Sequence, residues 1–439
     1  MRVEHLQPRL VSPRDDWHTW FGYYDTCPWS SDASRLLAHR ARFCDRFPRP
    51  DDACEIGFIE GWETDDPHFV TLAKSTAWNW QQGARLQWAT IDGAERLVFN
   101  DRRDGRPVGV ILNTDGSEHR LLEHPVYALA PDASAGLTLD FGRLSRLRPE
   151  YGLPGVEDPH ADDPAPDGAG VFALDLQTGA RRLIVSIASL DAHVAPGASS
   201  PAGGSLHQHV NHLMFNPSGT RFCFMHRFQR PDGILHSRLF TSDLAGADVR
   251  LLFEGMVSHY DWRDDETILA WAGKRSLLGG ASDGGRSPMK LAMTMARRTL
   301  KPIYYALGKP RVLMNKVLKD SYLLIRDAEG APTETFARGE LMTDGHCTFS
   351  RGGESSPGRW VLTDGYPDLK SRQPLFLWDT ARDAGVEIAR LETPRALDGE
   401  VRVDLHPRFS RDSRLVCVDS AMDGGRRLYV FDVSSITAG

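Results

Sequence analysis

The chain has 439 residues and a formal net charge of −7, with a sequence pI near 6.1. This acidic balance argues against a nucleic-acid-binding protein, which usually has a strongly basic surface. The N-terminus has no apolar stretch of signal-peptide length and no later segment reaches the length of a membrane span, so we expect a cytoplasmic protein without a transmembrane segment. Six cysteines without C-x-x-C spacing are expected to be free thiols in such a compartment.

Seven related segments recur along the chain, each with a short strand, a turn rich in Gly, Asp or Ser, and a more apolar strand. They begin at Thr26, Leu86, Val126, His212, His259, His346 and His406. This pattern is typical of a β-hairpin. A third strand of the form apolar-x-apolar-Asp follows every hairpin, and a fourth strand follows six of them.

The N-terminal segment "EHLQPRLVS" can supply the strand that the last unit lacks and so close a ring. Seven four-stranded units closed by an N-terminal strand predict an all-β fold, a seven-bladed β-propeller. We expect it to form a single domain over residues 1–439.

Three long insertions interrupt the repeats, at 142–168, 187–206 and 273–320. Blade topology places all three on the face where first strands begin and second strands end. Long loops on one face of a rigid scaffold usually carry function. The third insertion, in blade five, is expected to be partly helical. Its residues 290–319 hold eight basic and no acidic residues, which fits a cover for an anionic polymer, contact with a membrane surface, or a solvated loop.

Histidine occupies the same repeat position in four consecutive units: His212, His259, His346 and His406. The inner strands converge there on the central channel, so the four imidazoles can meet around one ion. Histidine-rich sites suit zinc, manganese or iron-type metals. The alternative is that such a histidine only hydrogen-bonds a turn, as in "DGH" at 344–346. Asp404 is either a further metal ligand or a solvated strand end.

Further polar side chains are expected on the same face of the propeller. They are Tyr24, Arg102, His209, Asn211, Arg227 and Tyr366. Strand alternation puts His209 and Asn211 on one side of their strand and His212 on the other.

Three stretches carry a family resemblance: the C-terminal "LHPRFSRDSRLVCVDSAMDGGRRLYVFDV", "SHYDW" at 258–262, and the H-x-x-F strand at His212. In them the chain resembles oligogalacturonate lyases, a family of cytoplasmic bacterial seven-bladed propellers, and it is more distantly similar to ulvan lyase propellers. The resemblance covers the C-terminal half; in the first 200 residues it is one of architecture. It implies metal ligands at His259 and His406 and a catalytic histidine at His212. Asp404 stands where the family has the first histidine of its "HPH" motif, so the ligand set differs.

The activity that this resemblance implies is β-elimination on a uronic-acid glycan. The reaction needs a base for the C5 proton, a cation that neutralises the carboxylate, and an acid for the leaving oxygen. We predict His212 as the base, Arg227 as an aid to the carboxylate and Tyr24 as the acid. The predicted ligands of a divalent metal, manganese or zinc, are His259, His346 and His406. The predicted substrate-binding residues are His209, Asn211, Arg102 and Tyr366.

The sequence therefore predicts a polysaccharide lyase with an anionic carbohydrate as substrate. Two other interpretations stay open. One is a non-catalytic propeller that binds glycans or proteins in a polysaccharide pathway. The other is a propeller glycoside hydrolase, which would normally use a pair of carboxylates.

Overall fold

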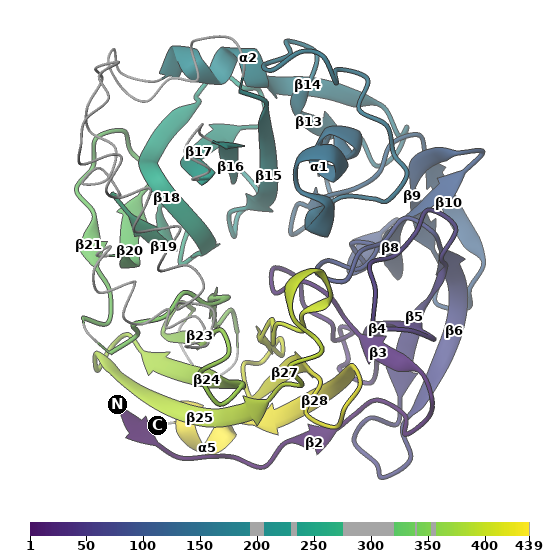
Figure 1. Ribbon diagram of the computed structural model, residues 1–439, viewed down its shortest axis with the longest axis vertical. Coiled ribbons are helices and arrows are strands. Elements are labelled where there is room, and N and C mark those ends of the chain that lie inside the picture. Colours follow the sequence, from purple (N-terminus) through teal and green to yellow (C-terminus); the bar gives the residue numbers. More distant parts are fainter. Residues whose placement is uncertain (194–205, 230–234, 275–319, 339, 353–356, 439) are drawn as a thin grey trace.

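The computed structural model describes residues 1–193, 206–229, 235–274, 320–338, 340–352 and 357–438. This part of the chain is nearly all-β, and its sheets follow one another in a ring around a central axis (Figure 1). A ring of mainly antiparallel sheets is the arrangement of a β-propeller. The predicted helix in the third insertion and the basic stretch 290–319 lie outside the described residues.

Four of the sheets have four strands each. In sheet order they are β3 (His18–Trp20), β4 (Leu36–Ala41), β5 (Cys54–Glu60) and β6 (His68–Ser75); β10 (Glu118–Leu122), β9 (Arg106–Leu112), β8 (Ala94–Arg103) and β7 (Gln87–Ile91); β11 (Ala128–Leu129), β12 (Gly136–Leu139), β13 (Gly170–Leu174) and β14 (Arg181–Ser186); and β2 (Arg9–Leu10), β28 (Arg427–Asp432), β27 (Leu415–Ser420) and β26 (Arg408–Phe409).

The two remaining sheets are larger. A five-stranded sheet has the order β1 (Arg2–Val3), β25 (Ala384–Glu392), β24 (Arg372–Asp379), β23 (Trp360–Asp364) and β22 (Thr348–Phe349). A seven-stranded sheet runs in chain order through β15 (Gln208–Phe215), β16 (Arg221–Gln229), β17 (Leu235–Asp243), β18 (Arg250–Trp262), β19 (Thr267–Gly273), β20 (Ser321–Arg326) and β21 (Glu334–Thr335).

The described helices are short. They are α1 (Phe141–Leu147), η1 (Pro149–Tyr151), α2 (Ile187–Leu190), η2 (Asp191–His193), η4 (Gly399–Val401) and α5 (Ser434–Thr437). α1 and η1 form part of the first insertion. None of the helices in the described ranges combines the length and hydropathy that crossing a bilayer requires.

The N-terminal segment joins the two ends of the chain. β2 pairs antiparallel with β28, with Arg9 opposite Val430 and Leu10 opposite Tyr429. The segment thus adds a fourth strand to the last three strands of the chain, as the sequence predicted. β1, just before it, pairs parallel with β25 of the neighbouring sheet, so one short segment connects two sheets at the seam of the ring (Figure 1).

Buried apolar side chains fill the spaces between neighbouring sheets. One cluster joins Leu139 and Val171 of one sheet to Val210 and Phe240 of the next. Alternate side chains of a strand point to opposite faces of its sheet, so strands with a neighbour on both faces are apolar on both. The six cysteines are free thiols, five of them buried, as expected.

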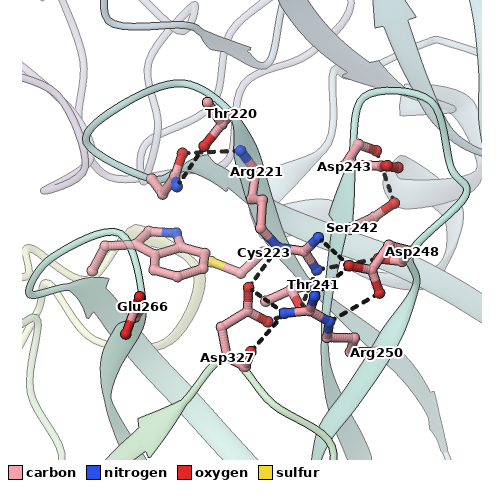
Figure 2. A network of polar contacts seen from close by, with 12 residues as sticks. Thr220, Arg221, Cys223, Thr241, Ser242, Asp243, Asp248, Arg250, Glu266 and Asp327 are labelled. Atoms are coloured by element: carbon pink, nitrogen blue, oxygen red, sulfur yellow. Dashed lines mark hydrogen bonds and ion pairs between the residues drawn. The ribbon is translucent and has the colours of Figure 1, made fainter.

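A network of ion pairs fastens β16, β17 and β18 to the end of β20 (Figure 2). The Asp327 carboxylate pairs with Arg221 at 2.5 Å and with Arg250 at 3.2 Å. It also accepts a hydrogen bond of 2.5 Å from the Thr241 hydroxyl. The Asp327 side chain is only 3% exposed, so this carboxylate is a buried anchor between the end of β20 and strands β16 to β18.

Replacing Asp327 by alanine is expected to lower the free energy of unfolding by about 3 kcal/mol, because Arg221 and Arg250 lose their buried partner and the Thr241 hydroxyl loses its acceptor. Asp248 is a matched control, since its carboxylate pairs with the same two arginines but is 43% exposed. Asp248→Ala should cost about 0–1 kcal/mol, as for exposed ion pairs. Denaturant unfolding of both variants measures this difference, and equal losses would contradict the assignment of Asp327 as the anchor.

Candidate metal centre and adjoining cleft

The structure brings the four predicted histidines together at the centre of the ring. The ring centroids of His259 and His346 are 4.0 Å apart, and those of His346 and His406 are 4.3 Å apart. Tyr23 links them to His212, because its ring stacks on His212 at 5.2 Å and meets His406 edge-on at 4.9 Å. All four imidazoles are at least 94% buried, with exposed fractions between 2% and 6%.

Two β-bulges set the positions of His212 and His259. The pairing of β15 with β16 shifts between Asn211 and Met214, and that of β18 with β19 shifts between Val257 and Tyr260. His212 has a φ of 54°, a left-handed conformation that few non-glycine residues adopt. The direction of the His212 side chain is therefore set by the bulge, and strand alternation alone does not describe it.

Tyrosine hydroxyls satisfy the backbone groups at both bulges. The amide of His212 donates to the Tyr127 hydroxyl at 3.1 Å, and the Tyr260 hydroxyl donates to the His212 carbonyl. The Tyr24 hydroxyl donates to the Tyr260 carbonyl and accepts from the Tyr260 amide, both at 3.1 Å. The phenol proton of Tyr24 is thus held by the backbone beside His259.

A group of candidate metal ligands lies among these histidines. His346, Asp404 and His406 each offer one ligand atom, and these atoms all lie within 4.8 Å of one another. Nε2 of His406 is buried and has no hydrogen-bond partner in the described structure. Imidazole nitrogen and carboxylate oxygen are suitable ligands for zinc and manganese, so the residues fit a divalent metal. His259 is not one of the three but its ring is 4.0 Å from that of His346.

Carboxylates neighbour these imidazoles. Asp344 accepts a hydrogen bond from Nδ1 of His259 at 2.9 Å, and Asp364 accepts one from Nδ1 of His346. Burial alone would lower the pKa of His346, but the carboxylates of Asp364, Asp404 and Asp344 raise it above its ordinary value. The Asp404 carboxylate also accepts a hydrogen bond of 2.7 Å from Nε of Arg402.

A cleft of about 460 Å³ adjoins the histidines. Its polar walls consist of three arginines, two tyrosines, two serines and two histidines: Arg148, Arg227, Arg402, Tyr151, Tyr366, Ser237, Ser258, His212 and His259. Arg148 and Tyr151 come from the end of α1 and from η1, in the first insertion. Three guanidinium groups around one cleft predict an anionic ligand.

Burial and charge hold the side chains of this cleft in defined protonation states. Burial, the charge of nearby Arg227 and other cations lower the pKa of His212 well below its ordinary value, so its imidazole is neutral at pH 7. Burial and the neighbouring Arg148 lower the pKa of Arg227 to about 10, which leaves its guanidinium charged. The cleft thus presents a neutral imidazole beside a buried cation.

The remaining predicted residues have different positions. Tyr366 lines the cleft. His209 and Asn211 are buried in β15 and their side-chain polar atoms have no hydrogen-bond partner in the described structure, but they do not line the cleft. The structure does not bring Arg102 to the cleft, because its guanidinium donates to the carbonyls of Pro50, at 2.7 Å, and Pro154.

Sequence reasoning did not identify Arg148, Tyr151 or Arg402 as cleft residues. Arg148 and Tyr151 lie in an insertion, where the repeat gives no register. The sequence did offer a signal for Arg402, because it lies two positions before Asp404, a candidate metal ligand.

Fold and site together define a β-propeller with a candidate metal centre beside a cleft that three arginines line. No family model and no curated protein sequence matches the chain. Solved structures do match its fold. An oligogalacturonate lyase in complex with manganese aligns over 98% of both chains, with a TM-score of 0.56 and 14% identity. An oligogalacturonate lyase from Vibrio parahaemolyticus aligns over 99% of both chains, with a TM-score of 0.58 and 14% identity. The chain therefore has the fold of oligogalacturonate lyases, which confirms the predicted resemblance at the level of fold.

Proposed function

We propose that this protein is a polysaccharide lyase that cleaves a uronic-acid-containing oligosaccharide or polysaccharide by metal-assisted β-elimination. The observation that carries the proposal is the position of the ligand group His346, Asp404 and His406 beside a cleft with three arginines. A metal and a cationic cleft are what the reaction needs around a carboxylate, because negative charge develops there as the C5 proton leaves.

We also propose that the ring has seven blades. β18 is 13 residues long; its first half pairs with β17 and its second half with β19. The seven-stranded sheet can thus be divided at β18 into two four-stranded units that share this strand. With the five other sheets, the ring would then have seven units, one for each sequence repeat.

The proposed ligands of a divalent transition metal, manganese or zinc, are His346, His406, Asp404 and the adjacent His259. The manganese in a solved structure of similar fold supports this assignment. A bound metal would neutralise the substrate carboxylate and so acidify the adjacent C–H bond. Arg227 is proposed to hold the same carboxylate with its buried guanidinium.

His212 is proposed as the base that accepts the C5 proton, since its imidazole is neutral and lines the cleft. The predicted acid, Tyr24, already donates its proton to the Tyr260 carbonyl. Tyr366 and Tyr151 line the cleft and are better placed to protonate the leaving oxygen. We therefore propose Tyr24 as a support for the β18 bulge and one of the two cleft tyrosines as the acid.

The pH dependence of kcat/KM tests the proposed base. A group whose pKa is lowered stays deprotonated to a lower pH, so the acid limb of the profile should lie below 6.5, the ordinary pKa of histidine. Besides burial, the neighbouring Arg227, His259, Arg148 and Arg85 all lower the pKa of His212. An acid limb of the kcat/KM profile with its midpoint at or above pH 6.5 would argue against His212 as the base.

Product analysis tests the reaction type. The purified protein, supplied with Mn²⁺ or Zn²⁺, is incubated with oligogalacturonate, polygalacturonate, alginate and ulvan, and the ultraviolet absorbance of unsaturated uronate is followed. The proposal predicts absorbing products from at least one of them. New reducing ends without this absorbance would identify a hydrolase. Binding without any cleavage would favour a glycan-binding propeller.

A further inference from the structure

Two aspartates, one before β22 and one at the end of β23, contact two neighbouring candidate ligands. Asp344 precedes β22 and its carboxylate lies 2.9 Å from Nδ1 of His259. Asp364 ends β23 and its two oxygens lie 3.0 and 2.9 Å from Nδ1 of His346. The Asp364 carboxylate also accepts a hydrogen bond of 2.7 Å from the backbone amide of His346. The Asp364 side chain is 3% exposed and that of Asp344 is 20% exposed.

These contacts determine which nitrogen of each imidazole is available to a metal. A carboxylate accepts hydrogen bonds, so Nδ1 of both His259 and His346 carries the proton. The lone pair is then on Nε2 in each ring, and the hydrogen bond fixes the ring orientation. Because the two ring centroids are only 4.0 Å apart, the two carboxylates orient a pair of adjacent donors.

The partners of these aspartates are unusual within this protein. Aspartates with nearly buried side chains elsewhere pair with arginine, among them Asp25, Asp327, Asp379, Asp404 and Asp419. Asp344 and Asp364 each pair with a histidine, and within the described ranges neither has an arginine or lysine partner. Their charge is thus directed at the two imidazoles and not used in a structural ion pair.

We propose that Asp344 and Asp364 are positioning residues that orient His259 and His346 for a divalent metal and increase the basicity of their Nε2 atoms. This inference rests on the proposed function, in which His259 and His346 are among the proposed ligands. Carboxylates behind metal-binding histidines typically contribute about 10–100-fold to metal affinity.

Calorimetric titration with Mn²⁺ and with Zn²⁺ tests the inference on the full chain. Asp364→Ala and Asp344→Ala should each weaken the binding of at least one ion by about 10–100-fold. Asp364→Asn keeps an acceptor oxygen and should restore part of the affinity. Asp379→Ala is the matched control. Asp379 is a buried aspartate of β24, in the same sheet as Asp364, and it lies opposite Trp360, the first residue of β23. Its carboxylate pairs with Arg359 at 3.0 Å. The metal affinity of this variant should equal that of the wild type.

Thermal unfolding in the presence of a chelator shows which variants are folded. If Asp364→Ala does not fold, Asp364→Asn and Asp344→Ala carry the test. If the wild type binds metal and all the folded variants bind it with the same affinity, the positioning role is overturned and the proposed function stays intact. A wild-type protein that binds neither ion overturns both.

Discussion

Replacing His212 by alanine is expected to lower kcat by about 10²–10⁴-fold, the usual contribution of a general base. His212 lines the cleft, and burial and neighbouring cations keep its imidazole neutral. Steady-state kinetics on the substrate found in the polymer screen gives kcat, with metal content and melting temperature measured on the same samples.

His212→Gln separates proton transfer from packing, because the amide can occupy the space beside Tyr23 but cannot act as a base. Both variants should retain metal and lose activity to a similar degree. Activity that survives in His212→Gln would show that His212 serves only to pack against Tyr23.

Replacing Arg227 by alanine is expected to lower kcat/KM by about 10²–10³-fold, comparable to the loss of one charge-stabilising donor at a reacting group. The Arg227 side chain is buried at the cleft, donates to the Val257 carbonyl at 2.7 Å, and has an Nε without a hydrogen-bond partner in the described structure. Its charge is therefore available to a substrate carboxylate. Arg227→Lys keeps the charge but not the planar guanidinium and should recover part of the loss.

Arg102→Ala is the control for the loss of an arginine on this face. Its guanidinium is bound to the carbonyls of Pro50 and Pro154, so we expect kcat/KM to change little. Equal losses in Arg102→Ala and Arg227→Ala would indicate a general electrostatic effect and contradict a specific role for Arg227.

The ring of sheets was predictable because the hairpin pattern repeats, and a repeat constrains every copy. The meeting of the histidines was predictable for the same reason, since equivalent positions of inner strands converge on one axis. The closing strand followed from the strand that the last unit lacks. Each of these inferences used symmetry and needed no knowledge of long-range contacts.

Other features of the site depend on contacts that leave no local signal. The left-handed backbone of His212 is stabilised by the hydroxyls of Tyr127 and Tyr260, which are distant in sequence. The hydroxyl of Tyr24, the predicted acid, makes the same kind of contact with the backbone of Tyr260. Arg148 reaches the cleft from an insertion that has no counterpart in the other repeats.

The histidine cluster is proposed to hold a metal, and the metal content of the purified protein, measured by elemental analysis, tests this directly. The purified wild type, dialysed against Mn²⁺ and Zn²⁺ and then freed of unbound ion, is compared with His346→Ala and His406→Ala. We predict close to one metal ion per wild-type chain and a large loss in both variants. A folded wild type without bound metal would overturn the proposed metal centre, and the histidines would then be hydrogen-bonding and packing residues of the central channel.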